Sequence, residues 1–190
     1  MTFPLSQVLG FFCTFLYGSF FEWTLHKYLM HQPRWQYPFR AHAVVHHGLF
    51  RTGPQYFLSD AKVIRKVRFA WWNAPMILIL HSPAILYIEY LFGSNILFGA
   101  LSAIVAYYSL YEYLHYCMHI PKGRWLEKTV WFRWLDSHHH MHHKRHFNNL
   151  NVVLPLADIV FGTLIPRNEH LPVPDREEGA IQVGVVLAES

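Results

Sequence analysis

Histidine is the residue type whose number and spacing in this chain most clearly indicate chemistry. The chain has 15 histidines, and six of them fall within "DSHHHMHHKRH" (136–146). Ten form groups with the spacings H-x4-H, H-x3-H-H, H-x3-H and H-x2-H-H: His26 and His31; His42, His46 and His47; His115 and His119; His139, His142 and His143. Because imidazole nitrogens bind iron, zinc and copper, this pattern predicts that the ten are metal ligands.

The spacings are those of helices, where residues three and four apart share a face. The sets expected to point the same way are His115 with His119, His42 with His46, and His139 with His142 and His143. His26 and His31 are five apart and should diverge on a straight α-helix, so either a helix ends there or they serve different metals. Zinc takes four ligands and octahedral iron takes six. Ten histidines therefore predict two metal ions, and the spacing does not say which histidine binds which ion.

Carboxylates near three of the groups are candidates to accept the second ring N–H of a ligand and so orient it. Glu22 is four residues before His26, Glu112 precedes His115 by three, and Asp136 precedes His139 by three. Asn149 and Asp158 are further candidates for supporting the ligands. For all five, a purely structural role stays open, such as a capped turn before Gly162.

The remaining histidines are interpreted more simply. His81, His138, His140 and His170 are predicted to be interfacial side chains, and the role of His146 is left open.

Composition indicates a membrane protein. Apolar residues make up 53% of the chain and charged residues 15%, against roughly 25% charged in an average soluble domain. The stretches Phe3–Tyr28, Phe69–Phe92 and Asn95–His119 each reach the length of about 20 residues that a crossing helix needs. The second contains Pro75 and Pro83, which predict a kink or two half-spanning pieces.

The distribution of basic residues predicts the topology. All 16 Lys and Arg residues lie in two segments, 27–68 and 122–176, which the positive-inside rule places on the cytoplasmic side. Three crossings follow, with the turn Gly93–Asn95 outside, or four if the second stretch is re-entrant. Every histidine group then lies on the cytoplasmic side.

The rest of the chain gives weaker signals. Residues 123–147 are predicted to form an amphipathic helix at the membrane surface, and the tail 166–190, with three prolines, an extended arm. Cys13 and Cys117 are predicted to be reduced, buried and structural. No basic run interleaved with aromatics indicates nucleic-acid binding. We expect a single domain, residues 1–190, and no oligomeric state is indicated.

The motifs "HKYLMH", "HAVVHH", "HYCMH" and "HHMHH", followed by "NNLNVVLPLADIVFGT" (148–163), resemble those of the fatty acid hydroxylase and sterol desaturase superfamily. The resemblance covers roughly Glu22 to Arg167. It implies an all-α integral membrane protein with about three to four transmembrane helices and a cytosolic, histidine-rich helical cap that holds a dimetal site. The implied activity is O2-dependent attack on a lipid C–H bond. "HKYLMH" is also similar to the first motif of carotenoid ring hydroxylases, whereas the ending fits the fatty acid and sterol branch.

The resemblance also implies cofactors and partners. Zinc is redox-inert, so we expect two iron ions with O2 as co-substrate, although zinc would also occupy such a site during purification. No cytochrome b5-like domain is fused to the chain, so electrons are expected from a separate cytochrome b5-like or ferredoxin-like protein. A membrane lipid would reach the metals along an apolar groove between the spans. A monooxygenase acting on a fatty acyl or similar chain is favoured. Desaturation, and sterol or carotenoid substrates, stay open, because the second group has three intervening residues where acyl 2-hydroxylases commonly have two.

Other classes fit the histidines less well. A membrane metal transporter places its ligands near the bilayer midplane, whereas the predicted span interiors hold little beyond His81 and Glu89. A haem cytochrome needs two axial histidines rather than ten. A zinc protease of the H-E-x-x-H type is excluded, because the motif is absent.

Overall fold

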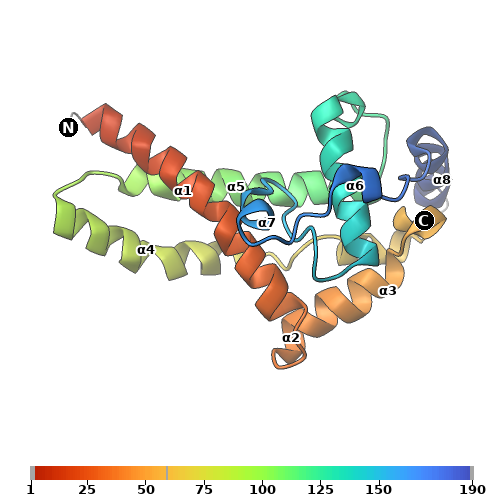
Figure 1. Ribbon diagram of the computed structural model, residues 1–190, viewed down its shortest axis with the longest axis horizontal. Helices are drawn as coiled ribbons and strands as arrows, with labels where there is room; N and C mark the ends of the chain where they lie inside the picture. Colours follow the sequence, from red (N-terminus) through yellow and green to blue (C-terminus); the bar gives the residue numbers. More distant parts are fainter. Residues whose placement is uncertain (1–2, 59, 189–190) are drawn as a thin grey trace.

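The fold, taken from a computed structural model that describes residues 3–58 and 60–188, is helical throughout its regular elements. Three helices are long: α1 (Phe3–Leu25), α4 (Asn73–Phe92) and α5 (Leu97–His119). No strand is formed within these two ranges, which confirms the predicted all-α class. Figure 1 shows α4 on one side, away from α6 and α8, and α5 running from beside α4 towards α6.

Two helices of the described chain are long and apolar enough to cross a membrane: Pro4–Met30 and Asn73–Phe92. Their large apolar side chains are widely exposed, for example Phe12 on α1 and Ile79 on α4. Exposed apolar surface of this extent indicates contact with lipid or a partner. The third predicted span, now α5, is not among the two; it carries Glu112, and eleven of its residues are buried within the protein. The predicted count of three or four crossings is therefore not confirmed.

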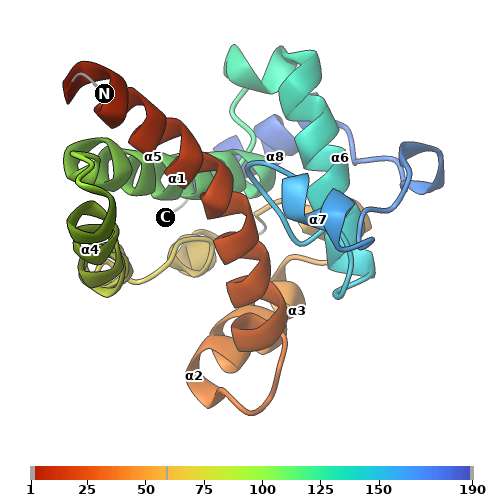
Figure 2. The same cartoon turned by 60° about the vertical axis from the view of Figure 1, so that its left-hand side comes forward.

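Helix α5 is the central element on which α1 and α4 pack, and Figure 2 shows α1 crossing it. The approach of α1 to α5 is close at Gly99, where an added Cβ would lie 2.0 Å from the main-chain oxygen of Gln7. The Gln7 side chain accepts from the Gly99 N–H (2.6 Å) and donates to the Asn95 carbonyl (2.8 Å). Small residues at such crossings are typical of membrane helix pairs.

Helix α4 is continuous from Asn73 to Phe92 although Pro83 lies inside it, so it is not the predicted pair of half-spanning pieces. It ends at Gly93, whose φ of 58° is the left-handed conformation common after a helix. The carboxylate of Glu89 accepts from the N–H groups of Ile96 (2.5 Å) and Leu97 (2.7 Å). The short turn between α4 and α5 is thereby fixed.

The shorter elements form a cap at the other end of α1 and α5. They are η1 (His26–Met30), α2 (Gln36–Phe39), η2 (Arg40–His46), α3 (His47–Leu49), η3 (Gly53–Tyr56), η4 (Ala61–Lys66), η5 (Leu126–Lys128), α6 (Val130–Lys144), α7 (Leu156–Val160), η6 (Arg167–Glu169) and α8 (Arg176–Ala188). An apolar cluster that includes Phe50, Tyr56, Leu114 and Phe132 fills the cap.

Three predictions about these parts are wrong. The helix predicted over 123–147 begins only at Val130, and although its first two residues are exposed, its residues 135–143 are all buried within the cap rather than lying on a surface. The tail 166–190 is not wholly extended: after its last proline the Asp175 carboxylate accepts from the N–H groups of Glu177 (2.7 Å) and Glu178 (3.1 Å), an arrangement that starts α8. Cys13 is exposed on the apolar surface of α1, whereas Cys117 is buried as expected. Both are free thiols.

Candidate metal centre

The ten predicted ligand histidines are gathered into two groups of five. The first histidine group is His26, His31, His42, His47 and His142; the second is His46, His115, His119, His139 and His143. Within each group one ring nitrogen per residue lies within 4.8 Å of the others, and all ten side chains are buried. The structure thus brings together the four sequence motifs, which span residues 26–143.

Two π-helical turns explain the first group. The His31 N–H bonds to the His26 carbonyl (3.2 Å), and the His47 N–H bonds to the His42 carbonyl. These i to i+5 bonds place residues five apart on one face, so His26 and His31 have stacked rings 5.1 Å apart and serve one group. The predicted end of the α-helix at this point is confirmed, and the two histidines lie in the same group.

Ordinary α-helical spacing supplies much of the second group. His115 and His119 are four apart on α5, as are His139 and His143 on α6. The remaining near neighbours point the same way but belong to different groups. The rings of His42 and His46 stack at 5.2 Å, and those of His139 and His142 at 5.7 Å. These stacked pairs hold the two groups side by side.

The Nε2 atoms converge within each group. In the first, neighbouring Nε2 atoms lie 2.8 Å (His26–His42), 3.1 Å (His42–His47) and 3.2 Å (His47–His142 and His31–His142) apart. In the second, the separations are 3.2 Å (His46–His115 and His119–His139) and 3.0 Å (His139–His143). Ligands at right angles on an ion about 2.1 Å away lie about 3.0 Å apart, against about 3.4 Å for a tetrahedral ion. The spacing matches adjacent positions of an octahedron.

The opposite ring nitrogens are tied to main-chain carbonyls, which can only accept. For the first group, His26 Nδ1 donates to Leu150 O (2.5 Å) and His142 Nδ1 to Asn148 O (2.9 Å). For the second, the Nδ1 atoms of His115, His119 and His143 donate to Val67 O (3.0 Å), Tyr56 O (2.8 Å) and Phe50 O. With the proton of these five rings fixed on Nδ1, their Nε2 atoms present a lone pair to their groups. The Nδ1 atoms of His46, His47 and His139 are buried without a hydrogen-bond partner in the described part of the chain.

The converging ring nitrogens of each group suit a bound cation. Lone pairs about 3 Å apart repel, and with Nδ1 protonated no proton lies between them. Protonating the rings is unfavourable, because burial, followed by the neighbouring imidazoles, lowers the pKa of His42, His47 and His142 well below 6.5. Five neutral imidazoles per group suit a transition metal. An octahedral ion would keep one position for an exogenous ligand.

The three nearby carboxylates were predicted to accept from the ligand rings, but each has other partners. Glu22 accepts from Tyr107 Oη (2.6 Å) and the Val152 N–H (2.5 Å) instead of His26. Glu112 accepts from the Phe69 N–H (3.1 Å). Asp136 accepts from Tyr56 Oη (3.0 Å). Main-chain carbonyls hold the ligand rings instead. Sequence spacing could not reveal this, because every residue has a carbonyl.

Asp158 and Asn149 organise the loop that carries two of these carbonyls. Asp158 accepts from the N–H groups of Leu150 (3.0 Å) and Asn151 (2.8 Å) and from Thr163 Oγ1 (2.6 Å). Asn149 has a left-handed φ of 52°, and its Oδ1 accepts from the Ile165 N–H (2.7 Å). Neither residue contacts a ligand ring in the described structure, so both act through the loop.

The other histidines are not the interfacial side chains that were predicted. His138 is fully buried and lies 3.1 Å from Asp158 Oδ2, and His140 accepts from the Gly53 N–H (3.2 Å). His170 is half-buried against Ser137 Oγ (2.8 Å). His81 lies midway along α4 and faces a pocket. His146 is exposed with its ring 4.4 Å from that of His47.

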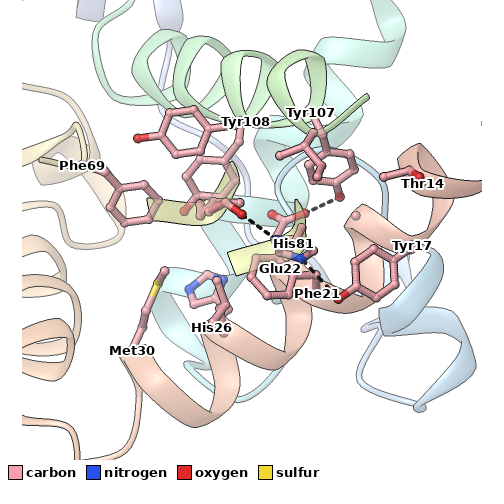
Figure 3. A pocket seen from close by; sticks show the side chains of 15 residues that line it. Thr14, Tyr17, Phe21, Glu22, His26, Met30, Phe69, His81, Tyr107 and Tyr108 are labelled. Atoms are coloured by element: carbon pink, nitrogen blue, oxygen red, sulfur yellow. Dashed lines mark hydrogen bonds between the residues drawn. The ribbon is translucent and has the colours of Figure 1, made fainter. Parts of the chain in front are cut away.

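An apolar pocket between α1, α4 and α5 reaches the first group (Figure 3). Its empty space is about 630 Å³ including the mouth, and its lining is almost wholly apolar. His26 of the first group is one of its lining residues. Two polar pairs lie on the wall: Tyr107 Oη donates to Glu22 (2.6 Å), and Tyr17 Oη lies 3.3 Å from His81 Nε2. The buried hydroxyl of Tyr111, which also lines the pocket, has no hydrogen-bond partner among the described residues. The residues that line the pocket are Thr14, Tyr17, Gly18, Phe21, Glu22, Leu25, His26, Met30, Phe69, Ile77, His81, Ile104, Tyr107, Tyr108 and Tyr111.

Comparison with known proteins gives one match. The fatty acid hydroxylase family model matches residues 11–163. The matched segment includes all ten grouped histidines and the loop up to Thr163, and it ends before α8. No curated protein and no solved structure gives a significant match to the chain.

Proposed function

The chain belongs to the fatty acid hydroxylase family, and on that premise we propose that it is an integral-membrane monooxygenase that uses two iron ions and O2 to hydroxylate a lipid C–H bond. The observation that carries the proposal is the pair of buried five-histidine groups beside an apolar pocket that His26 of the first group lines. A dimetal oxygenase needs both parts: a ligand set for two ions, and a dry space for a hydrocarbon chain.

The first histidine group would hold one ion and the second the other. A bound pair of iron ions would supply the redox chemistry that activates O2, which redox-inert zinc cannot. The chain's own part is to hold the ions, orient the lipid and exclude water. Burial of all ten ligand side chains and of residues 135–143 supports the exclusion of water.

The pocket supports a hydrocarbon substrate. Its lining is almost wholly apolar and comes mainly from three helices, α1, α4 and α5. No lysine or arginine of the described chain lines the pocket, and the Glu22 carboxylate on its wall is paired with Tyr107, so the pocket suits an alkyl segment better than a charged headgroup. We propose that an alkyl segment enters between α1 and α4 and that its reacting carbon lies next to His26. A fatty acyl or similar chain fits this description; desaturation of the same chain, or a sterol or carotenoid substrate, is the alternative chemistry at the same site.

The setting in the cell is part of the proposal. Candidate spans α1 and α4 support insertion in the membrane, and the clustering of basic residues in 27–68 and 122–176 supports a cytoplasmic position for the cap. A separate small redox protein, cytochrome b5-like or ferredoxin-like, would supply the electrons.

A lipid profile tests the proposal. A heterologous host would express the wild-type chain or the His142→Ala variant, and mass spectrometry would compare their lipids. We expect a lipid that has gained one oxygen atom in the wild type alone. Loss of two hydrogens instead would assign desaturation to the same site. If an unchanged profile persisted when candidate electron donors were co-expressed, and the purified chain held no iron, the enzyme assignment would be wrong.

A further inference from the structure

The C-terminal helix contacts residues next to the second histidine group, from a part of the chain that lies beyond the family match. We infer that Arg176, the first residue of α8, is a positioning residue for the second histidine group. The inference rests on the metal-binding function proposed above. It assigns a role to a segment that neither the histidine motifs nor residues 11–163 include.

Arg176 is buried as a cation between two acids. Its side chain is 15% exposed, and its guanidinium lies 2.6 Å from Asp136 Oδ2 and 3.2 Å from Glu127 Oε2. Both carboxylates are themselves buried. The guanidinium also lies over the rings of Phe132 (4.9 Å) and Phe57 (5.6 Å). A planar group with five donors can satisfy several acceptors at once, which a lysine cannot.

The same guanidinium caps the helix that carries two ligands. The last four carbonyls of an α-helix have no partner within the helix. At the end of α5, Arg176 donates to the carbonyl oxygens of Cys117 (2.6 Å) and Met118 (3.5 Å). The next carbonyl, that of His119, accepts from the Leu58 N–H (2.9 Å). Arg176 therefore fixes the turn on which His119 sits.

A second path joins Arg176 to the ring of His119. Arg176 pairs with Asp136, and Asp136 Oδ1 accepts from Tyr56 Oη (3.0 Å). The main-chain oxygen of Tyr56 accepts from His119 Nδ1 (2.8 Å). The tyrosine is fully buried, and its ring centre lies 4.7 Å from that of His119. Arg176 thus acts on both the backbone and the ring orientation of this ligand.

The docking of α8 keeps Arg176 in place. Gly179 lies against Phe57 so closely that an added Cβ would be 2.4 Å from the ring, and Val183 is fully buried. The contacts of Arg176 and of Tyr56 all lie on the side of the second group. The ring nitrogens of the first group that have a carbonyl partner use Asn148 and Leu150, to which Arg176 makes no contact in the described chain. The effect should be confined to one group.

Metal titration of separated sites tests this inference. Chelator-stripped, full-length protein in detergent would be titrated with Zn²⁺ in two backgrounds, each of which lacks two histidines of one group. His42→Ala combined with His142→Ala leaves the second group intact, and His119→Ala combined with His139→Ala leaves the first. Replacement of a residue that orients a ligand typically weakens metal affinity by about 10–100-fold. We expect Arg176→Gln to weaken Zn²⁺ binding by that factor in the background that lacks His42 and His142 and to leave it unchanged in the other. Arg176→Lys should fall between.

Further variants separate positioning from a general loss of stability. Arg133→Gln replaces an exposed arginine of α6 and should leave both affinities unchanged. Tyr56→Phe removes only the hydroxyl that reaches Asp136, and it should weaken the second site even if Arg176→Gln does not fold. Equal weakening of both sites by Arg176→Gln, or unchanged affinity of the second site with a lowered Tm, would overturn the inference. A wild-type chain that binds fewer than two ions would instead contradict the proposed function.

Discussion

At the residue scale, the metal centre depends on which nitrogen of each imidazole carries its proton. Main-chain carbonyls accept from the Nδ1–H of five of the ten histidines. Three of these carbonyls belong to residues 50–67 and two to residues 148–150. A carbonyl fixes the ring as a carboxylate would but adds no charge, so each metal keeps five neutral ligands. Under the proposed function, ions held by these groups would keep their positive charge, because the described part of the chain places no carboxylate on the ligand rings.

Removal of one ligand should empty one group and spare the other. We predict that His119→Ala binds one metal ion per chain where the wild type binds two, and that its turnover is abolished. The loss follows because the remaining imidazoles of the second group no longer surround the ion. Metal analysis of the purified variant by mass spectrometry checks this. His170→Ala, a half-buried histidine outside both groups, is the control. Retention of two ions and wild-type turnover in His119→Ala would show that His119 is not a ligand.

The stability of the metal-free protein should fall as the pH falls below 6.5. Burial, followed by the neighbouring histidines, lowers the pKa of His31 to about 2 and that of His139 well below 6.5. A folded-state pKa below the unfolded value means that the unfolded chain binds more protons, so stability is complete above 6.5 and decreases towards lower pH. The free energy of unfolding, measured between pH 7.5 and 5, should decrease with a slope that corresponds to the uptake of more than one proton on unfolding. Bound metal should shift the decline to lower pH, whereas a flat profile without metal would contradict the buried, neutral assignment.

At the residue scale the sequence predicts which histidines gather but not what holds them. The four motifs identify the ten side chains because a ligand must be a particular residue type at a helical spacing. Glu22, Glu112 and Asp136 were expected behind the rings because carboxylates are visible in a sequence. The atoms found there belong to Phe50, Tyr56, Val67, Asn148 and Leu150. Nothing in the identity of these residues marks them.

At the element scale, the two π-helical turns decide how the ligands divide between the groups. In η1 and η2 the bond from residue i+5 to residue i places His26 with His31 and His42 with His47. Spacing read on an α-helix predicts a different division, because it assumes 3.6 residues per turn. π-Helical turns are rare and occur frequently at functional sites. The local sequence contains no signal that distinguishes them from α-helix.

Two segments, one for each group, supply the carbonyls, and the loop 148–151 depends on Asp158. We predict that Asp158→Asn lowers the free energy of unfolding by about 2–3 kcal/mol, because an amide cannot accept all the bonds that Asp158 accepts. Displacement of Leu150 should also weaken metal binding by the first group about tenfold or more. Chemical denaturation and Zn²⁺ titration in the background that lacks His119 and His139 measure the two effects. Asp175→Asn, at the exposed start of α8, is the matched control, and full affinity in Asp158→Asn would contradict the role of the loop.

At the scale of the whole molecule, an exposed apolar part and a buried histidine-rich cap share one long helix. Helix α5 begins in the apolar part and ends with His119 at the metal centre, so its burial against α1 and the cap positions the second group. Composition predicts this division, since charged residues are nearly absent from the long helices. The number of crossings cannot be derived in the same way. Many apolar residues of α5 are buried against other parts of the protein, so their hydropathy does not show that the helix contacts lipid.

The proposed topology makes a prediction about opposite sides of the membrane. With Cys13 replaced by serine, Asn95→Cys should react with a membrane-impermeant thiol reagent in intact cells, because the turn after α4 is proposed to lie outside. Lys122→Cys should react only after permeabilisation, because it follows α5 on the proposed cytoplasmic side. Both positions are exposed in the structure, and Cys117 is buried. Reaction of both variants from the same side would contradict the crossing of α5.

The most direct measurement is a reaction of the purified protein with ¹⁸O2. The protein would be loaded with Fe²⁺, placed in lipid vesicles with a chemical reductant, and its lipids analysed by mass spectrometry beside those of the His142→Ala variant. We predict a lipid that carries one ¹⁸O atom with the wild type alone, with two iron ions bound per chain. Two bound iron ions without any oxidised lipid, across acyl, sterol and carotenoid vesicles, would contradict oxygen transfer to a lipid as the function of this chain.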